Sequence, residues 1–114
     1  MIASALGTAG TPDTYLDGTR DLWVEWKAVG SADYWPRELK GKYLPTPLQR
    51  VWLDRRYANG GNAVCIVGFK LRGRAHGVIL PTPALWAGPV SRETYEPMMQ
   101  SAAELAAYIE RRIT

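Results

Sequence analysis

Residues 63–69 read Ala-Val-Cys-Ile-Val-Gly-Phe, a nearly continuous apolar run with the length of one β-strand. Successive side chains of a strand point to opposite faces, so an unbroken apolar run predicts a strand that is covered on both faces. Such a strand is typical of a sheet with helices packed on either side. The segment therefore favours an α/β fold.

The stretch before this strand carries the signals of a helix. Thr46 precedes Pro47, and Gln49 stands where a capping-box side chain reaches back to the N-cap. Asn59-Gly60-Gly61 ends the pattern. The spacing predicts a helix over 46–59 whose buried stripe follows the i, i+3, i+4, i+7 rule, namely Leu48, Val51, Trp52 and Arg55.

The strand is followed by a basic turn at residues 70–74 and by a second apolar stretch at residues 76–80, which Pro81 terminates. Near the end of the chain, Ser101-Ala-Ala-Glu104 repeats the capping-box pattern. The helical stripe that follows is Leu105, Tyr108, Ile109 and Arg112. We expect a strand and a final helix in these two places.

Upstream, Asp17-Gly18 is a hairpin signal between residues 14–16 and 21–28. The second arm alternates, with Leu22, Val24, Trp26 and Ala28 on one face and Asp21, Trp23, Glu25 and Lys27 on the other. Residues 29–45 show no sustained period, so we expect a long loop with a short turn of helix. The predicted order is β-β-loop-α-β-β-α, in a single domain over 1–114.

Composition bounds the class of protein. The 114 residues are 46% hydrophobic and 22% charged, which suits one globular domain. One Cys and one His exclude a disulfide framework and a Cys-rich or His-pair metal site. No apolar run approaches the ~18–20 residues of a membrane helix, and the first ten residues lack the pattern of a signal peptide. We therefore expect a cytoplasmic protein without a membrane partner.

The charge is unevenly distributed along the chain. The formal net charge is +3, but residues 37–74 hold nine cationic side chains and two acidic ones, a local charge of +7. The remainder carries five cations and nine acids, or −4. A basic segment interleaved with Trp and Tyr is typical of a phosphate-backbone binder, although a solvated basic surface explains it equally well.

Three charged residues stand where the hairpin brings its ends together. Asp13 begins the first arm, and Glu25 and Lys27 lie near the end of the second. Residues two apart on a strand share a face and lie roughly 6–7 Å apart. Two carboxylates with a backbone carbonyl form a hard oxygen site suited to Mg²⁺ or Mn²⁺. The ion would activate a water toward a phosphodiester, with Lys27 beside it.

Two other interpretations of these residues stay open. A same-face ion pair between Glu25 and Lys27 explains both residues without a metal, because such pairs are common on half-exposed sheets. Asp21 shares the face of Glu25 and competes with Asp13 as the first carboxylate. We prefer Asp13, because Asp21 would lie ~13 Å from Glu25 along an extended strand.

The pattern resembles the PD-(D/E)xK nuclease superfamily, most of all its small VRR-NUC and Holliday-junction-resolvase-like members. The similarity covers about residues 10–69 and reads Gly-Thr-Pro-Asp13, Val-Glu25-Trp-Lys27-Ala, Thr-Pro-Leu-Gln49-x-x-Trp-Leu, Gly-Gly-Asn-Ala and the apolar strand. The resemblance implies a restriction-endonuclease-like fold, a central mixed sheet with helices on both faces. It also implies that Asp13, Glu25 and the Trp26 carbonyl bind the ion, that Lys27 is the catalytic lysine, and that Gln49 supports the site. Gln49 is equally well explained as the cap of its own helix.

These observations predict a Mg²⁺-dependent or Mn²⁺-dependent endonuclease that hydrolyses DNA, with branched or Holliday-junction DNA suggested by family analogy alone. The alternative is a non-catalytic nucleic-acid-binding accessory protein with a nuclease-like fold. We expect the core to hold Trp23 and Trp26. The expected DNA contacts are Lys40, Lys42, Arg50 and Arg55, together with the loop aromatics Trp35 and Tyr43.

Family members usually carry a helix before the Asp hairpin, and only twelve residues, none acidic, precede Asp13. Either the site works with two carboxylates, or a partner subunit replaces the missing part, or the chain is a reduced or truncated version of the family fold. Because a small single-site nuclease needs two copies to act on two strands, we expect a homodimer. The compact chain suits a virus-encoded protein that acts in the host cytoplasm.

Overall fold

The computed structural model describes residues 3–4, 14–16, 18 and 20–114, and its centre is a mixed β-sheet. In the described part of the chain this sheet has six strands in the order β1-β2-β3-β5-β6-β8. The strands are β1 (Ala3–Ser4), β2 (Thr14–Leu16), β3 (Leu22–Ala28), β5 (Ala63–Leu71), β6 (Arg74–Leu80) and β8 (Met99–Ser101). Among them, only β3 and β5 pair in parallel. The predicted β2–β3 hairpin is confirmed.

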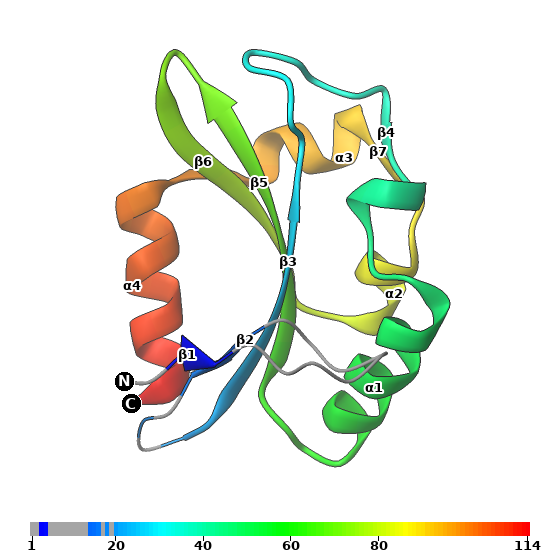
Figure 1. Ribbon diagram of the computed structural model, residues 1–114, viewed down its shortest axis with the longest axis vertical. Coiled ribbons are helices and arrows are strands. Elements are labelled where there is room, and N and C mark those ends of the chain that lie inside the picture. Colours follow the sequence, from blue (N-terminus) through cyan, green and yellow to red (C-terminus); the bar gives the residue numbers. More distant parts are fainter. Residues whose placement is uncertain (1–2, 5–13, 17, 19) are drawn as a thin grey trace.

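Helices cover both faces of the sheet. Figure 1 shows α4 (Ala102–Ile113) on one side, and α1 (Pro47–Ala58), α2 (Pro83–Ala87) and α3 (Arg92–Tyr95) on the other. The predicted α/β class, with a mixed sheet between two layers of helices, is therefore confirmed. Within the described ranges, no helix has the length and apolar character needed to cross a membrane.

Strand β5 contributes to two separate cores. Ala63, Cys65 and Val67 face α1 and α2, where they join Leu53, Trp86 and other buried residues. Val64 and Ile66 face the opposite way and pack beneath α4. Both faces are buried, as the unbroken apolar run predicts, because a strand exposes its side chains alternately. The sheet is thus the middle layer of three.

The segment predicted as a long loop contains short regular elements. The chain that leaves β3 forms β4 (Glu38–Leu39) and the 3₁₀ turn η1 (Gly41–Tyr43) before α1 begins. Strand β4 pairs antiparallel with β7 (Val90–Ser91), so a distant segment orders it. Sequence periodicity could not reveal β4, because two paired residues are too short to show a period.

Helix α1 has the predicted ends but not the predicted buried face. Thr46 and Gln49 form the capping box, and Asn59 is the C-cap. Of the described side chains of α1, however, only Leu53 is buried, while Leu48 is 63% and Val51 54% exposed. Of the predicted stripe only Trp52 packs on the sheet, against Trp23, because α1 also packs on α2 through a different side, where the Trp86 indole N–H donates to Asp54 Oδ1 (2.7 Å).

The last third of the chain is only partly predicted. Helix α4 has its capping box, and its apolar stripe packs on the sheet as expected. Between β6 and α4, the predicted order lacks α2, β7, α3, η2 (Glu96–Met98) and β8. Thr82-Pro83 does carry the start signal of α2, because the Thr82 hydroxyl accepts from the Leu85 N–H. The helix is too short for a periodic stripe.

Candidate active site

Glu25 is the one charged side chain among the described residues that is fully buried. It lies on the face of β3 that packs toward α1, and its strand partner in β5 is Cys65. Burying a carboxylate is costly unless an opposite charge or hydrogen bonds compensate it. Lys27 provides such a charge, since its Nζ lies 3.4 Å from Glu25 Oε2. The predicted placement of both residues on one face is therefore confirmed.

The pair lies just past the described part of the hairpin. Thr14, the first residue of β2, pairs with Val24, the neighbour of Glu25. Asp13, the predicted first carboxylate, lies outside the described residues, so its place beside Glu25 stays a prediction. Asp21, the competing candidate, lines a hollow with Arg20, Arg56 and Asn62 and takes no part in lining the cleft beside Lys27.

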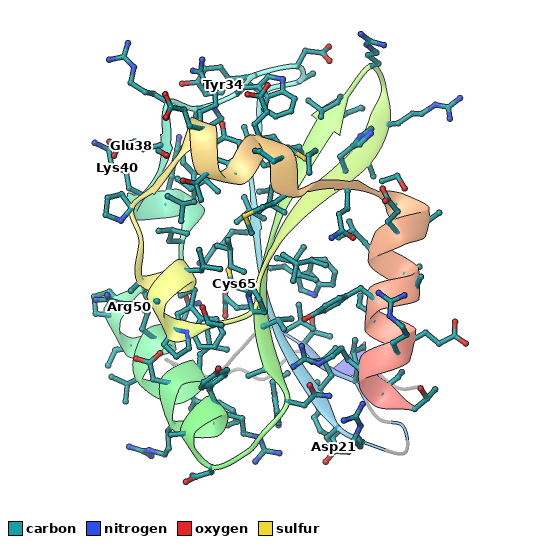
Figure 2. The ribbon with its side chains drawn as sticks, turned by 180° about the vertical axis from the view of Figure 1, so that it is seen from behind. Asp21, Tyr34, Glu38, Lys40, Arg50 and Cys65 are labelled. Atoms are coloured by element: carbon teal, nitrogen blue, oxygen red, sulfur yellow. The ribbon has the colours of Figure 1, made fainter. Side chains whose placement is uncertain are left out.

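Lys27 lines a cleft of about 490 Å³ between β3, the η1 turn, the start of α1 and the turn after α2. Among the described residues that line this cleft, four are cationic and none is acidic. The four are Lys27, Lys40, Lys42 and Arg50. In Figure 2, Lys40 and Arg50 lie on the same side of the molecule. A hollow lined by charges of one sign concentrates counter-ions, so this cleft suits an anion.

The capping box of α1 fixes one wall of the cleft. Gln49 Oε1 accepts from the Thr46 N–H (2.8 Å), and the Gln49 N–H donates to Thr46 Oγ1 (3.2 Å). The Gln49 side chain is thereby engaged in the cap, which explains the residue without a role at a metal site. The next residue, Arg50, donates its backbone N–H to the Thr46 carbonyl and lines the cleft.

The structure brings together three of the four predicted DNA contacts. Lys40 and Lys42 flank Gly41 in the η1 turn, and Arg50 faces them from α1. Arg55 lies elsewhere, in a hollow with Trp52 and Asn59 near the end of α1. The cleft also uses Ala87 and Pro89, which the sequence did not single out because no element was predicted there.

The aromatic residues follow the prediction in part, since Trp23, expected in the core, packs against the core on the α1 side. Trp26, expected in the core, is 40% exposed. Trp23 is half-buried and packs on Trp52, with ring centroids 4.8 Å apart. Trp35 stacks on the buried Tyr95, with centroids 6.2 Å apart and rings within 9° of parallel, so its ring belongs to the core. The residue before it, Tyr34, is instead 49% exposed.

Oxygen donors for a divalent ion are present but few. The Glu25 carboxylate and the Trp26 carbonyl are hard ligands of the kind that Mg²⁺ accepts, and Mg²⁺ commonly keeps several waters. No group of three or more His, Cys, Asp or Glu side chains occurs in the part of the chain that the structure covers. The donors thus fit the ion in kind, and a second carboxylate would have to come from Asp13.

Comparisons with protein-family models, with curated proteins and with solved structures find no match for this chain.

Proposed function

We propose that the protein is a Mg²⁺-dependent endonuclease that hydrolyses phosphodiester bonds of DNA, of the PD-(D/E)xK type. One observation carries the proposal: Lys27, the ion-pair partner of the buried Glu25, lines a cleft whose described lining includes four cationic residues and no carboxylate. An ion pair that served only stability would need no such cleft. A nuclease needs both, because its substrate is a polyanion and its chemistry needs a carboxylate beside a cation.

The Glu25 carboxylate, the Trp26 carbonyl and Asp13 would hold the ion, which would lower the pKa of a bound water and offset charge on the phosphate. Lys27 lies between Glu25 and the cleft, with its side chain 17% exposed. Its ammonium therefore reaches both the carboxylate and a phosphate in the cleft. It donates a hydrogen bond to a non-bridging phosphate oxygen, where negative charge develops as water attacks phosphorus and the ester P–O bond breaks.

The remaining cations of the cleft position the strand. Arg50 is anchored by the first turn of α1, and Lys40 and Lys42 project from a turn held by the Tyr43 N–H to Lys40 carbonyl bond (3.2 Å). Contacts of this kind to phosphates carry no sequence information but fix the register of the chain. A protein that uses them selects DNA by shape, in agreement with the proposed preference for branched DNA.

The finer features of the fold belong to the same proposal. A mixed sheet with helices on both faces is the arrangement that a restriction-endonuclease-like fold requires. A homodimer would supply one site for each strand of a junction. Light scattering should give twice the mass of the chain, and a monomer mass at every concentration would contradict the dimer without affecting the assignment of the site.

The test is cleavage by the purified protein of a four-way junction, a flap and a linear duplex, in Mg²⁺, Mn²⁺ or EDTA. We expect cleavage only with a metal ion, and a loss of about 100-fold or more for Lys27→Ala, the size of effect seen when one charge-stabilising donor is removed. Lys70→Ala is the matched control, because Lys70 is an exposed lysine of β5 outside the cleft. Absence of cleavage, or equal cleavage by Lys27→Ala, would refute the proposal that the protein is a nuclease.

A second candidate function is a nucleic-acid-binding protein without catalysis. It is favoured by the 3.4 Å contact of Glu25 with Lys27 and by the engagement of Gln49 in its cap, since both residues are then explained structurally. This candidate predicts binding of the same DNA substrates in EDTA, with dependence on Arg50 and Lys42, and no cleavage with any metal ion.

A further inference from the structure

A second hollow adjoins the cleft. It has a volume of about 690 Å³ and shares Lys40, Gly41 and Lys42 with the cleft, so the η1 turn forms a common rim. Beyond this rim it is lined by residues that the proposed reaction does not use, among them Tyr34, Arg37, Tyr43 and Arg92. A chain that leaves the cleft over Lys42 therefore enters this hollow.

The floor of the hollow is held rigidly. Arg92 donates from Nη2 to the Trp35 carbonyl (2.7 Å), and its backbone N–H donates to the Arg37 carbonyl (2.9 Å). The buried Tyr95 hydroxyl donates to the Pro36 carbonyl between them. Since the Trp35 ring is stacked inward on Tyr95, this stretch of backbone is fixed from below.

Two side chains of this fixed stretch remain available to a ligand. Tyr34 is 49% exposed, and Figure 2 shows it at the same end of the molecule as Glu38 and Lys40. Arg37 is also exposed. The one acidic side chain among the described lining residues, Glu38, pairs with Lys40 (3.5 Å), and Arg37, Lys42 and Arg92 leave the lining with a net positive charge. The hollow thus combines an exposed aromatic ring with cations.

This combination suits an unpaired polynucleotide strand. Bases stack on aromatic side chains only where they are free of their own duplex, while cations along the groove follow the phosphates. A duplex keeps its bases stacked inside and offers the ring only its backbone. The exposed Tyr34 ring therefore favours the binding of a single strand over that of a duplex.

We propose that this hollow binds an unpaired strand next to the cleft, with a base on the Tyr34 ring and phosphates on Arg37 and Lys42. The proposal rests on the proposed function and sharpens it, because the substrate class becomes DNA or RNA with a single-stranded arm beside the scissile bond. Nothing in the chemistry of the hollow selects deoxyribose, so both kinds of strand are tested.

The experiment is fluorescence anisotropy of labelled oligonucleotides in EDTA: single-stranded DNA, RNA of the same sequence, and the blunt DNA duplex. Tyr34→Ala should weaken binding of a single strand by about 5-fold or more, the lower end for the loss of one base stack. Tyr34→Phe should bind like the wild type, because the ring is kept. The affinity for the duplex should change less than twofold.

Arg37→Ala should weaken single-strand binding and reduce the slope of log K against log salt by about 0.7, the value for one phosphate contact. Arg111→Ala, an exposed arginine of α4 on the other face of the sheet, is the control of equal charge. Unchanged binding in Tyr34→Ala, an equal loss for duplex and single strand, or no measurable binding by the wild type at low salt would overturn the proposal. Because EDTA prevents cleavage, this result is independent of whether the protein is a nuclease.

Discussion

Strand β3 has opposite surroundings on its two faces. Toward α4, Leu22 and Val24 are buried among apolar side chains. Toward α1, the alternate positions hold Glu25 and Lys27, an ion pair beside a cleft. The period of two in a strand allows one segment of seven residues to serve both purposes. The α4 face can supply stability while the α1 face carries charges that a well-packed core would exclude.

The covering helices differ in the same sense. Helix α4 contributes a row of apolar side chains to its core, namely Leu105, Tyr108, Ile109 and Ile113. These side chains of α4 are partly buried, whereas α1 fully buries Leu53 and its first turn forms a wall of the cleft. Although both sides of the sheet hold apolar cores, we expect substitutions on the α4 face of β3 to act on stability and substitutions at Glu25 and Lys27 to act on function.

The largest effect is expected for Glu25→Gln, which keeps the shape of the side chain and removes its charge. Cleavage should fall by about 100-fold or more, because an amide neither holds a divalent ion as well nor balances Lys27. The rate is measured on the preferred DNA substrate with Mg²⁺, and circular dichroism verifies folding. A folded variant with wild-type activity would show that Glu25 is not part of the site and would contradict the proposed difference between the two faces of β3.

Leu22→Ala tests the opposite face of the same strand. Leu22 is fully buried, and such truncations cost about 2–5 kcal/mol. We expect the free energy of unfolding, measured with urea, to decrease by this amount. The cleavage rate per folded molecule should stay within twofold of the wild type. A large loss of activity in the folded variant would show that the α4 face also shapes the site.

Tyrosines on the two faces should lower stability in alkali. Burial is the main cause that raises the pKa of Tyr108, on α4, and of Tyr95, on the α1 side of the sheet, above 10.0. As pH rises past 10, a tyrosine in the unfolded chain loses its proton first, so stability present below pH 10 is lost above it. Urea midpoints from pH 8 to 11 should decline less in Tyr108→Phe than in the wild type, and an equal decline would contradict this.

The smallest expected effect is a difference between the two capping boxes in how strongly pH changes their contribution to stability. Hydrogen bonds from Ser101, first from its backbone N–H and then from its side chain, lower the pKa of Glu104 below 4.5, whereas the box of α1 uses the neutral Gln49. The Glu104 contribution is therefore present above pH 4.5 and lost as pH falls through the lower, folded-state pKa. Glu104→Gln should reduce the drop in the urea midpoint between pH 7 and pH 3. An undiminished drop would show that the α4 cap is not titrating.

Much of the fold follows from local patterns. The alternation of β3, the apolar run of β5 and the caps at Thr46 and Ser101 each depend on neighbouring residues, and the structure confirms all four. The shared face of Glu25 and Lys27 is predictable for the same reason, since residues two apart on a strand point the same way. Strand β4 and helix α2 were missed, because elements of two to five residues have no measurable period.

Which of these residues meet depends on the packing of distant segments. Local sequence patterns are enough to place Glu25 and Lys27 on one face and Arg50 in the first turn of a capped helix. They do not determine that the helix start faces the η1 turn across a cleft, nor that Leu48 is exposed while Leu53 is buried. A periodic pattern fixes a side chain only relative to its own helix or strand, whereas the packing of one element on another depends on contacts between residues far apart in the chain.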